Sequence, residues 1–161
     1  MRITLKRPNE CQQSELEEFV DLVRLGREVQ RNGLESRVEH AWCLAFVRQR
    51  NVLQACGGVK VPDPGRRQKY FTAAAISDDA DKYRLELGWV FVVPSLRGLG
   101  IADDMTRKLV EFVDGEALYA TSAAANKPMH RILSGAGFST NEKGFRLNGD
   151  RDLWLFVRPS A

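Results

Sequence analysis

The sequence lacks the residue patterns of a metal site or a disulfide framework. It has two histidines and three cysteines among 161 residues, and no two cysteines have C-x-x-C spacing. Cys11, Cys43 and Cys56 are therefore expected to be reduced, small apolar residues. His40 and His130 have no partner at ligand spacing, and we expect both on helix surfaces. The sequence predicts no metal ion and no cysteine chemistry.

Long apolar runs and a one-sided charge are also missing. No segment approaches the length of a membrane helix, and Met1 to Asn9 lacks the apolar stretch and cleavage site of a secretory signal. We therefore expect a cytoplasmic protein without a membrane partner. The net charge of +3, from 24 basic and 21 acidic residues, is too small to indicate a nucleic-acid partner. The basic cluster Arg66 to Lys69 fits a solvated loop, although it would also suit an acidic acceptor.

The length and patterning that are present fit a single α/β domain. A chain of 161 residues can bury a core without crosslinks, and no repeat, linker or low-complexity segment divides it. We therefore expect one domain over residues 1–161. Apolar periodicity, punctuated by glycine and proline, defines its elements. In chain order they are an edge strand at Ile3 and Leu5, a helix capped by Ser14 and Glu17 and ending near Gly26, a short helix at 34–41, a hairpin of strands 42–47 and 52–61, a strand at 85–93, a helix from 101, a strand at 117–123, a helix begun at Asn126 and ended by Gly135 and Gly137, and strands near Phe145 and at 153–157.

Two segments have weaker patterns. Gly57 and Gly58, inside the second hairpin strand, predict a bulge or a place where another backbone or a ligand comes close. The stretch from Pro62 to Lys82 is interrupted by proline and glycine, and its alanine-rich part, Thr72 to Ile76, fits helix or strand. Loops of this length within compact domains are often functional.

The strongest functional signal is a glycine-rich turn between the apolar strand that ends at Pro94 and the helix that follows. Gly98 and Gly100 lack a Cβ, so the backbone can approach an anion closely, and Arg97 can add a charged fork. The first turn of a helix presents unpaired N–H groups and the positive end of the helix dipole. Three or four charge-assisted hydrogen bonds of about 1.5–3 kcal/mol each would hold a dinucleotide-like tail.

The same glycines would also make a plain strand-to-helix turn. A Rossmann site needs G-x-G-x-x-G early in the chain, whereas here Gly98-x-Gly100 is followed by Asp103 and lies late in the sequence, after the hairpin. There is no Walker lysine pattern, so nucleoside triphosphates are disfavoured. The choice between a plain turn and an anion site therefore depends on the surrounding sequence.

That surrounding sequence matches a known arrangement. Arg97-Gly98-Leu99-Gly100-Ile101-Ala102 fits the motif Arg/Gln-x-x-Gly-x-Gly/Ala, and the strand before it ends in Pro94. Downstream, Asn126 and Gly137-Phe138 reproduce a later helix with the same spacing. In these elements, which cover Leu85 to Phe138, the sequence resembles the GNAT superfamily of N-acetyltransferases. The resemblance extends in outline to the whole chain.

The resemblance implies an α/β (α+β) fold, with a mixed central sheet that is splayed at its middle and flanked by helices. It implies that acetyl-CoA lies in the opening, with the backbone of Val90, Phe91 and Val92 pairing with the pantetheine amides. The N–H of Val92 would also meet the oxyanion of the reaction. Asn126 would face the cofactor from the opposite side. The pyrophosphate would be held by Arg97, Gly98, Leu99, Gly100, Ile101 and Ala102.

The resemblance also suggests how the acceptor amine loses its proton. An amine with a pKa near 10 is neutral in about one molecule per thousand at pH 7, so deprotonation costs about 4 kcal/mol. Glu86 lies six residues before Val92, where some family members have a general-base glutamate, and we expect it to accept that proton. The alternatives are a solvent-facing glutamate and a structural ion pair. Leu133 stands where many relatives place a tyrosine general acid, which leaves Tyr119, Ser134 or water as the proton donor to the thiolate.

The expected function is direct transfer of an acetyl group from acetyl-CoA to a primary amine, most simply that of a small molecule. One alternative is a regulator or toxin-like enzyme that acetylates a protein lysine or an aminoacyl group. Another is a non-catalytic module that binds acyl-CoA, which Leu133 suggests because it stands at the position of the usual tyrosine acid. Homodimers are common in the family, so a homodimer is a further expectation. The segments expected to select the acceptor, Pro62 to Lys82 and the first two helices, contain no motif that names it.

Overall fold

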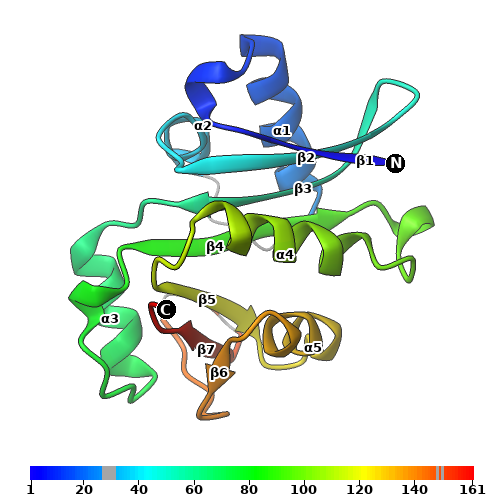
Figure 1. Ribbon diagram of the computed structural model, residues 1–161. Helices are drawn as coiled ribbons and strands as arrows, with labels where there is room; N and C mark the ends of the chain where they lie inside the picture. The colour runs from blue at the N-terminus through cyan, green and yellow to red at the C-terminus, as the bar shows by residue number, and fades with distance from the viewer. Residues whose placement is uncertain (27–31, 148, 150) are drawn as a thin grey trace. The chain divides into compact units, whose positions relative to one another are not determined.

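The computed structural model describes residues 1–26, 32–147, 149 and 151–161 (Figure 1). Contacts within the chain group its residues into two units, each made of two chain segments. Unit 1 contains Met1–Val61 and Leu87–Phe112, and unit 2 contains Pro62–Glu86 and Val113–Ala161. The single domain expected over residues 1–161 stays a prediction.

The described strands form a mixed seven-stranded sheet in the order β1-β2-β3-β4-β5-β7-β6. β4 and β5 are parallel, whereas β1–β2, β2–β3, β5–β7 and β6–β7 are antiparallel. β4 belongs to both units, because Leu85 and Glu86 lie in unit 2 and its other residues lie in unit 1. The bounds are β1 (Arg2–Lys6), β2 (Cys43–Gln49), β3 (Val52–Lys60), β4 (Leu85–Val92), β5 (Leu118–Ala123), β6 (Ser139–Thr140) and β7 (Leu153–Arg158).

The helices within the described residues flank these strands. None of them is both long and apolar enough to cross a membrane. The α-helices are α1 (Gln13–Leu25), α2 (Leu34–Glu39), α3 (Pro64–Ala73), α4 (Ile101–Phe112) and α5 (Lys127–Gly135). Short 3-10 helices are η1 (Pro8–Glu10), η2 (Ala80–Lys82) and η3 (Pro94–Leu96).

In unit 1, α1 and α2 share an apolar core with the strands. The periodic apolar residues of α1 are buried there with Leu34 and Val38 of α2, which confirms the predicted amphipathic helix. The ring of Phe19 packs edge-on against Phe46 and Trp89, with ring centroids 5.6 and 5.9 Å apart. Aromatic pairs in this arrangement add to the free energy of simple apolar burial.

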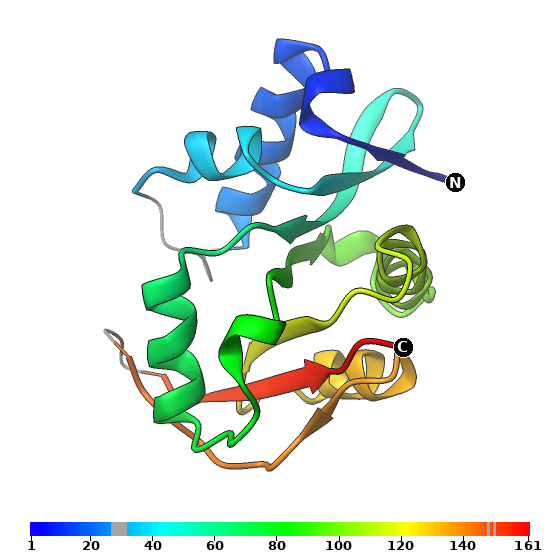
Figure 2. The same ribbon diagram turned by 60° about the vertical axis from the view of Figure 1, so that its left-hand side comes forward.

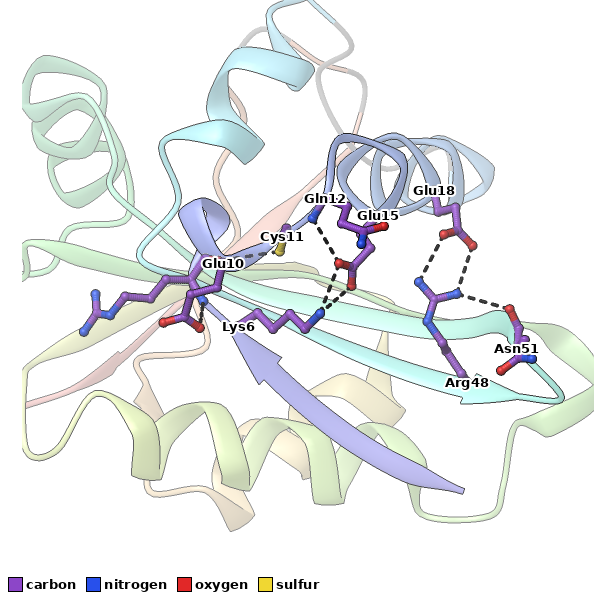
Figure 3. Close-up of polar contacts among 9 residues, drawn as sticks. Lys6, Glu10, Cys11, Gln12, Glu15, Glu18, Arg48 and Asn51 are labelled. Carbon is purple, nitrogen blue, oxygen red and sulfur yellow. Dashed lines mark hydrogen bonds and ion pairs between the residues drawn. The ribbon is translucent and has the colours of Figure 1, made fainter.

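Two ion pairs fasten α1 to the strands of unit 1 (Figure 3). Lys6 Nζ lies 2.8 Å from a carboxylate oxygen of Glu15, which joins β1 to α1. Arg48 Nη1 lies 2.9 Å from a carboxylate oxygen of Glu18, which joins β2 to the same helix. Because both pairs start from neighbouring strands, they fix the helix over the sheet at two points.

The start of α1 differs from the prediction. The backbone N–H of Gln12 donates to the Glu15 carboxylate at 3.0 Å, and the helix begins at the next residue (Figure 3). The cap predicted at Ser14 and Glu17 is therefore two residues too late. The Glu15 side chain supplies one half of a capping box, and the Glu15 N–H donates to the Gln12 backbone carbonyl at 3.0 Å instead of to a cap side chain.

Gly57 and Gly58 of β3 allow close packing rather than a bulge. A Cβ on Gly57 would lie 3.3 Å from side chains of α4, and a Cβ on Gly58 would lie 3.0 Å from the Trp89 ring. The register of the β2–β3 hairpin shifts instead between Val47 and Arg48. The bulge predicted at this glycine pair is wrong, and what comes close is mainly side chains, not the further backbone or ligand that the sequence predicted.

In unit 2, α3 and α5 cover opposite faces of the sheet (Figures 1 and 2). Along β7, Leu155 and Val157 share a core with residues of α3. Trp154 and Phe156, which alternate with them, contact the His130 ring of α5. Successive side chains of a strand point to opposite faces, so each helix meets its own half of β7.

The two histidines differ in their surroundings. His40 is exposed at the end of α2, as expected. His130 is only 8% exposed, so the surface position expected for it is wrong. Its ring stacks on Trp154 with centroids 4.6 Å apart, and Nε2 lies 2.9 Å from the Ala123 carbonyl oxygen. His130 is a core residue with a satisfied hydrogen bond.

The weakly patterned segment from Pro62 to Lys82 forms α3 and η2. The Asp63 side chain accepts a hydrogen bond from the Arg66 N–H at 2.9 Å and caps α3, which runs as far as Ala73. The basic cluster Arg66 to Lys69 therefore lies on a helix, and the expected solvated loop is wrong. Arg67 within it is only 6% exposed.

The last strands also differ from expectation. The strand expected near Phe145 is an isolated bridge to Leu153. A two-residue strand, β6, which the sequence did not predict, pairs with β7 instead. The strand predicted at 153–157 is confirmed as β7.

Candidate functional site

The glycine-rich turn lies in unit 1, between η3 and α4. Gly98 and Gly100 both have a φ of +80°, a conformation that L-residues rarely adopt. A Cβ on either glycine would meet no atom within 4 Å, so the glycines are needed for backbone conformation and not for packing. The turn therefore has the geometry that the sequence predicted, with open space beside it.

The amides at the start of α4 have no side-chain cap. Among the described residues, no side chain accepts a hydrogen bond from the N–H groups of Gly98 to Ala102. Asp103, in the first turn, pairs with Arg107 one turn later at 3.2 Å. These amides and the positive end of the helix dipole therefore fit an anion from outside the chain.

Arg97 connects this turn to β4. Its Nε donates to the Val92 carbonyl oxygen at 2.9 Å, and its guanidinium lies 5.4 Å from the centroid of the Phe91 ring. Within unit 1, β4 is the last strand in the sheet order, and β3 binds one of its edges. Val90 and Phe91 are partly exposed, whereas Val92 is buried. Arg97 thus ties the turn to the strand that the resemblance assigns to the pantetheine.

β4 contains a backbone irregularity that the sequence did not reveal. Trp89 has a φ of +56° although its side chain is only 5% exposed. A bulky residue held in this region costs about 1–3 kcal/mol, and such strain is common at functional sites. The neighbouring Gly88 lets Lys60 cross the strand, since a Cβ on Gly88 would lie 2.5 Å from Lys60 Cε. Lys60 Nζ then lies 4.9 Å from the centroid of the Trp89 ring. The glycine inside an otherwise apolar strand was the signal that could have indicated this crossing.

In unit 2, Glu86 and Tyr119 are paired residues of the parallel strands β4 and β5. Paired residues point their side chains to the same face of a sheet. α3 covers this face, because the rings of Tyr119 and Phe71 pack with centroids 5.4 Å apart. Glu86 is 9% exposed, which rules out the solvent-facing alternative. Its role as a general base stays a prediction.

Arg66 brings a positive charge to this face. Its Nε and Nη2 donate to the Tyr70 hydroxyl oxygen at 3.0 and 2.7 Å. Burial lowers the pKa of the guanidinium, but the hydrogen bond to Tyr70 and the nearby Glu86 carboxylate outweigh it, so the pKa of Arg66 is raised. Arg66 therefore adds a charge on the side of the sheet where Glu86 lies.

Arg67, the next residue, anchors α3 to η2. Its Nη2 lies 2.9 Å from a carboxylate oxygen of Asp81, and its Nη1 donates to the Tyr83 carbonyl oxygen at 3.4 Å. Its Nε is buried and has no hydrogen-bond partner among the described residues. A buried donor without a partner costs about 1–3 kcal/mol, so such a group is uncommon in a folded protein.

No family model matches the sequence, and no curated protein sequence matches it either. Solved structures do resemble the chain. An acyl-CoA N-acyltransferase from Pseudomonas aeruginosa has a TM-score of 0.69 at 14% identity, with 98% of this chain and 99% of that chain covered. A GNAT-family acetyltransferase from Bacillus cereus gives 0.65 at 12% identity, with 100% and 99% covered. NAA60 of Arabidopsis thaliana, in complex with acetyl-CoA, gives 0.64 at 19% identity, with 97% and 98% covered.

The chain has the GNAT fold. The mixed sheet with flanking helices, expected from the Arg97 to Ala102 motif and its context, is confirmed by these structures and by the observed strand order. Likeness at 12–19% identity concerns the fold. The binding roles of Val90 to Val92, Arg97 to Ala102 and Asn126, and the splay of the sheet, stay predictions.

Tyr119 of β5 is one of the three candidate proton donors to the thiolate, with Ser134 and water. Burial raises the pKa of Tyr119 far above its ordinary value, and Glu86 raises it further. Its hydroxyl is buried and has no hydrogen-bond partner among the residues that the structure describes. A thiolate, whose conjugate acid has a pKa of about 8.5, is a weak base beside such a phenolate. Proton transfer from Tyr119 to the thiolate is therefore uphill, and the same is true of a serine hydroxyl or water, so Tyr119, Ser134 and water all stay candidates.

The GNAT-like helix α5 contains the remaining predicted positions. Asn126 Oδ1 accepts a hydrogen bond from the Met129 N–H at 3.3 Å, which confirms it as the helix cap. Leu133, at the position of the missing tyrosine, has no exposed surface. Ser134 is exposed. The place of the usual acid is thus filled by an apolar core residue.

All three cysteines are free thiols, and Cys43 and Cys56 are buried. Within the described ranges, no group of histidine, cysteine, aspartate and glutamate side chains is arranged to hold a metal ion.

Proposed function

We propose that this chain is an N-acetyltransferase that moves an acetyl group from acetyl-CoA to the primary amine of a small molecule. The observation that carries the proposal is the uncapped turn from Arg97 to Ala102 at the start of α4, within the GNAT fold. Structures of this fold have been solved with the cosubstrate or its product, since NAA60 is in complex with acetyl-CoA and the NatC complex is bound to Gag peptide and CoA.

The proposed binding of acetyl-CoA uses mainly backbone groups. The amides from Gly98 to Ala102, with the Arg97 guanidinium, bind the pyrophosphate. The backbone of Val90 to Val92 pairs with the pantetheine amides as an added strand would. The Asn126 oxygen caps α5, so its amide nitrogen is the group that this residue offers to the cofactor.

The proposed chemistry is direct attack without a covalent enzyme intermediate. The amine nitrogen attacks the thioester carbonyl carbon, an N–C bond forms, the C–S bond breaks, and coenzyme A leaves as a thiolate. Glu86 accepts the proton of the amine, and the Val92 N–H donates to the developing oxyanion. The thiolate needs little help from an acid, because its conjugate acid has a pKa of about 8.5, and Tyr119, Ser134 and water are the candidate proton donors.

A peptide or protein amine is the second candidate acceptor. The NatC complex of this fold is bound to Gag peptide, and α3 presents the exposed basic residues Arg66 and Lys69. A third candidate is a module that binds acyl-CoA without catalysis. The buried Leu133 supports it, because it stands at the position of the usual tyrosine acid. Release of coenzyme A with any amine excludes the third candidate, and comparison of small amines with peptides separates the first two.

Gly100→Trp tests the proposed pyrophosphate site. The indole would fill the space in front of the α4 amides and remove at least two charge-assisted hydrogen bonds, so the Kd for acetyl-CoA should rise about 100-fold or more. Isothermal titration calorimetry measures this change. Gly33→Trp is the matched control, because Gly33 also lies in unit 1, has a φ of +70° and has open space around its Cβ position. Unchanged affinity in a folded Gly100→Trp variant would count decisively against the proposal.

A further inference from the structure

The first turn of α3 has an unusual charge. Arg66 and Arg67 occupy it, and no acidic residue lies there. The positive end of a helix dipole favours acidic side chains, and the one that offsets these arginines is Asp63 at the N-cap, outside the first turn. Local conflicts of this kind are expected where a site, rather than the helix itself, determines the residue type.

Arg66 is held in a fixed orientation although it is exposed. Two of its nitrogens donate to the Tyr70 hydroxyl, and its guanidinium lies 5.3 Å from the centroid of the Tyr70 ring. Tyr70 is buried and packs edge-on against Phe145. A surface arginine normally moves through many rotamers, so this anchoring prepares the guanidinium for a ligand at low entropic cost.

The face below Arg66 has two buried polar atoms that the protein leaves without a partner. They are Tyr119 Oη and Arg67 Nε, both in residues more than nine-tenths buried. Tyr119 is paired with Glu86 across β4 and β5, and it shares a buried cluster with Tyr70, the residue that holds Arg66, so these groups lie on the same face of unit 2. Glu86, the two arginines and the unpartnered donors therefore all belong to the side of unit 2 that α3 covers.

We propose that the acceptor bears a carboxylate next to its amine, as an amino acid does, and that Arg66 binds this carboxylate while Glu86 takes the proton of the amine. This inference rests on the proposed acetyl transfer. A guanidinium beside the base repels acceptors that are only cationic, such as polyamines. A zwitterion instead places its ammonium group at Glu86 and its carboxylate at Arg66, where a charge-assisted pair can form.

The test compares free amino acids with their primary amides, which have the same side chain and lack the carboxylate. The α-amine of an amide is the weaker base, so more of it is neutral at pH 8 and its intrinsic reactivity favours the amide. A higher kcat/KM for the acid therefore requires recognition of the carboxylate. We expect the wild type to prefer the acid by about 10- to 100-fold, the range of one charge-assisted interaction.

Arg66→Met should remove this preference by raising KM for the acid, with KM for acetyl-CoA unchanged. Arg66→Lys should restore part of it, because the charge returns without the planar fork. Lys69→Met is the matched control, since Lys69 is exposed on the same helix, and it should keep the full preference. Circular dichroism confirms that each variant is folded.

The outcomes separate this inference from the proposed function. Coenzyme A release with amines or amides but not with amino acids overturns the carboxylate site and leaves acetyl transfer standing. Equal losses for acid and amide in Arg66→Met also overturn it, because Arg66 would then be structural. If no amine is acetylated, the protein is titrated with N-acetyl amino acids. Binding that is lost in Arg66→Met supports the carboxylate site even though acetyl transfer fails, and absence of binding overturns the site.

Discussion

The surroundings of Glu86 are assembled from segments that are distant in sequence. Its neighbour on the sheet, Tyr119, belongs to β5, and the nearby positive charge comes from Arg66 of α3. The spacing from Glu86 to Val92 was enough to select the glutamate from the sequence. It could not select Arg66, because that proximity requires both the β4–β5 pairing and a helix that the sequence pattern did not show.

Glu86→Gln should abolish most acetyl transfer without affecting cosubstrate binding. Loss of a general base typically lowers kcat by about 10²- to 10⁴-fold, whereas Glu86 has no assigned role in holding acetyl-CoA. Coenzyme A release over an amine panel and calorimetric titration with acetyl-CoA measure the two effects. Glu116→Gln, which removes a half-exposed charge from the same unit, should leave both unchanged. Full turnover in Glu86→Gln would remove Glu86 from the mechanism.

The helices differ in how far their sequences predicted them. α1 and α4 bury apolar residues at helical spacing, and α5 buries Leu133 together with His130, so periodicity with the flanking caps and glycines located all three. The buried residues of α3 are Arg67, Tyr70 and Phe71, so its helical period is carried partly by a charged side chain. The spacing of apolar residues alone therefore does not predict this helix. The unusual burial of Arg67 depends on its partners Asp81 and Tyr83, which lie outside α3.

Asp63→Ala should destabilise α3 in particular. Asp63 caps the helix through the Arg66 N–H, and its carboxylate offsets the two arginines of the first turn. Loss of such a cap costs about 1 kcal/mol. Urea unfolding measures the loss of stability, and hydrogen exchange should be faster at the amides of α3 than elsewhere. Asp103→Ala, which removes a surface pair with Arg107 and no cap, should cost clearly less. Equal costs for the two variants would show that the cap is unimportant.

Taken as a whole, the chain passes between its two units three times, after Val61, Glu86 and Phe112. Each unit is therefore built from two separated segments. The order of strands and helices along the sequence was sufficient to predict the GNAT fold, since the motif at Arg97 to Ala102 fixed one strand and one helix of that order. The grouping of segments was not predictable, because chain length and composition say nothing about which segments contact one another.

The stability of the chain should depend on pH through Glu15. A hydrogen bond from the Gln12 N–H, followed by one from Lys6, holds the pKa of Glu15 below its ordinary value of 4.5 (Figure 3). A carboxyl whose pKa is lower in the folded state stabilises the fold above its unfolded pKa, and this contribution is lost as the pH falls through the folded pKa. The free energy of unfolding of the wild type should therefore exceed that of Glu15→Gln at neutral pH, and this difference should shrink as the pH falls below about 4.5.

Urea unfolding of both proteins at a series of pH values measures this difference. Lys6→Met should reproduce part of the effect, because it removes one of the two hydrogen-bond donors to Glu15. A difference in unfolding free energy that stays constant from pH 7 to pH 3 would mean that Glu15 has the same proton affinity in the folded and unfolded chain.

The three free thiols should react too slowly to disturb a colorimetric thiol assay. Burial raises the pKa of Cys11 and of Cys43 to about 11, and it raises the pKa of Cys56 as well. A thiol with a pKa of 11 is thiolate in about one molecule per thousand at pH 8, and only the thiolate reacts with disulfide dyes. Such a dye should therefore report liberated coenzyme A against a nearly silent protein background, and no cysteine needs to be replaced before acceptor screening.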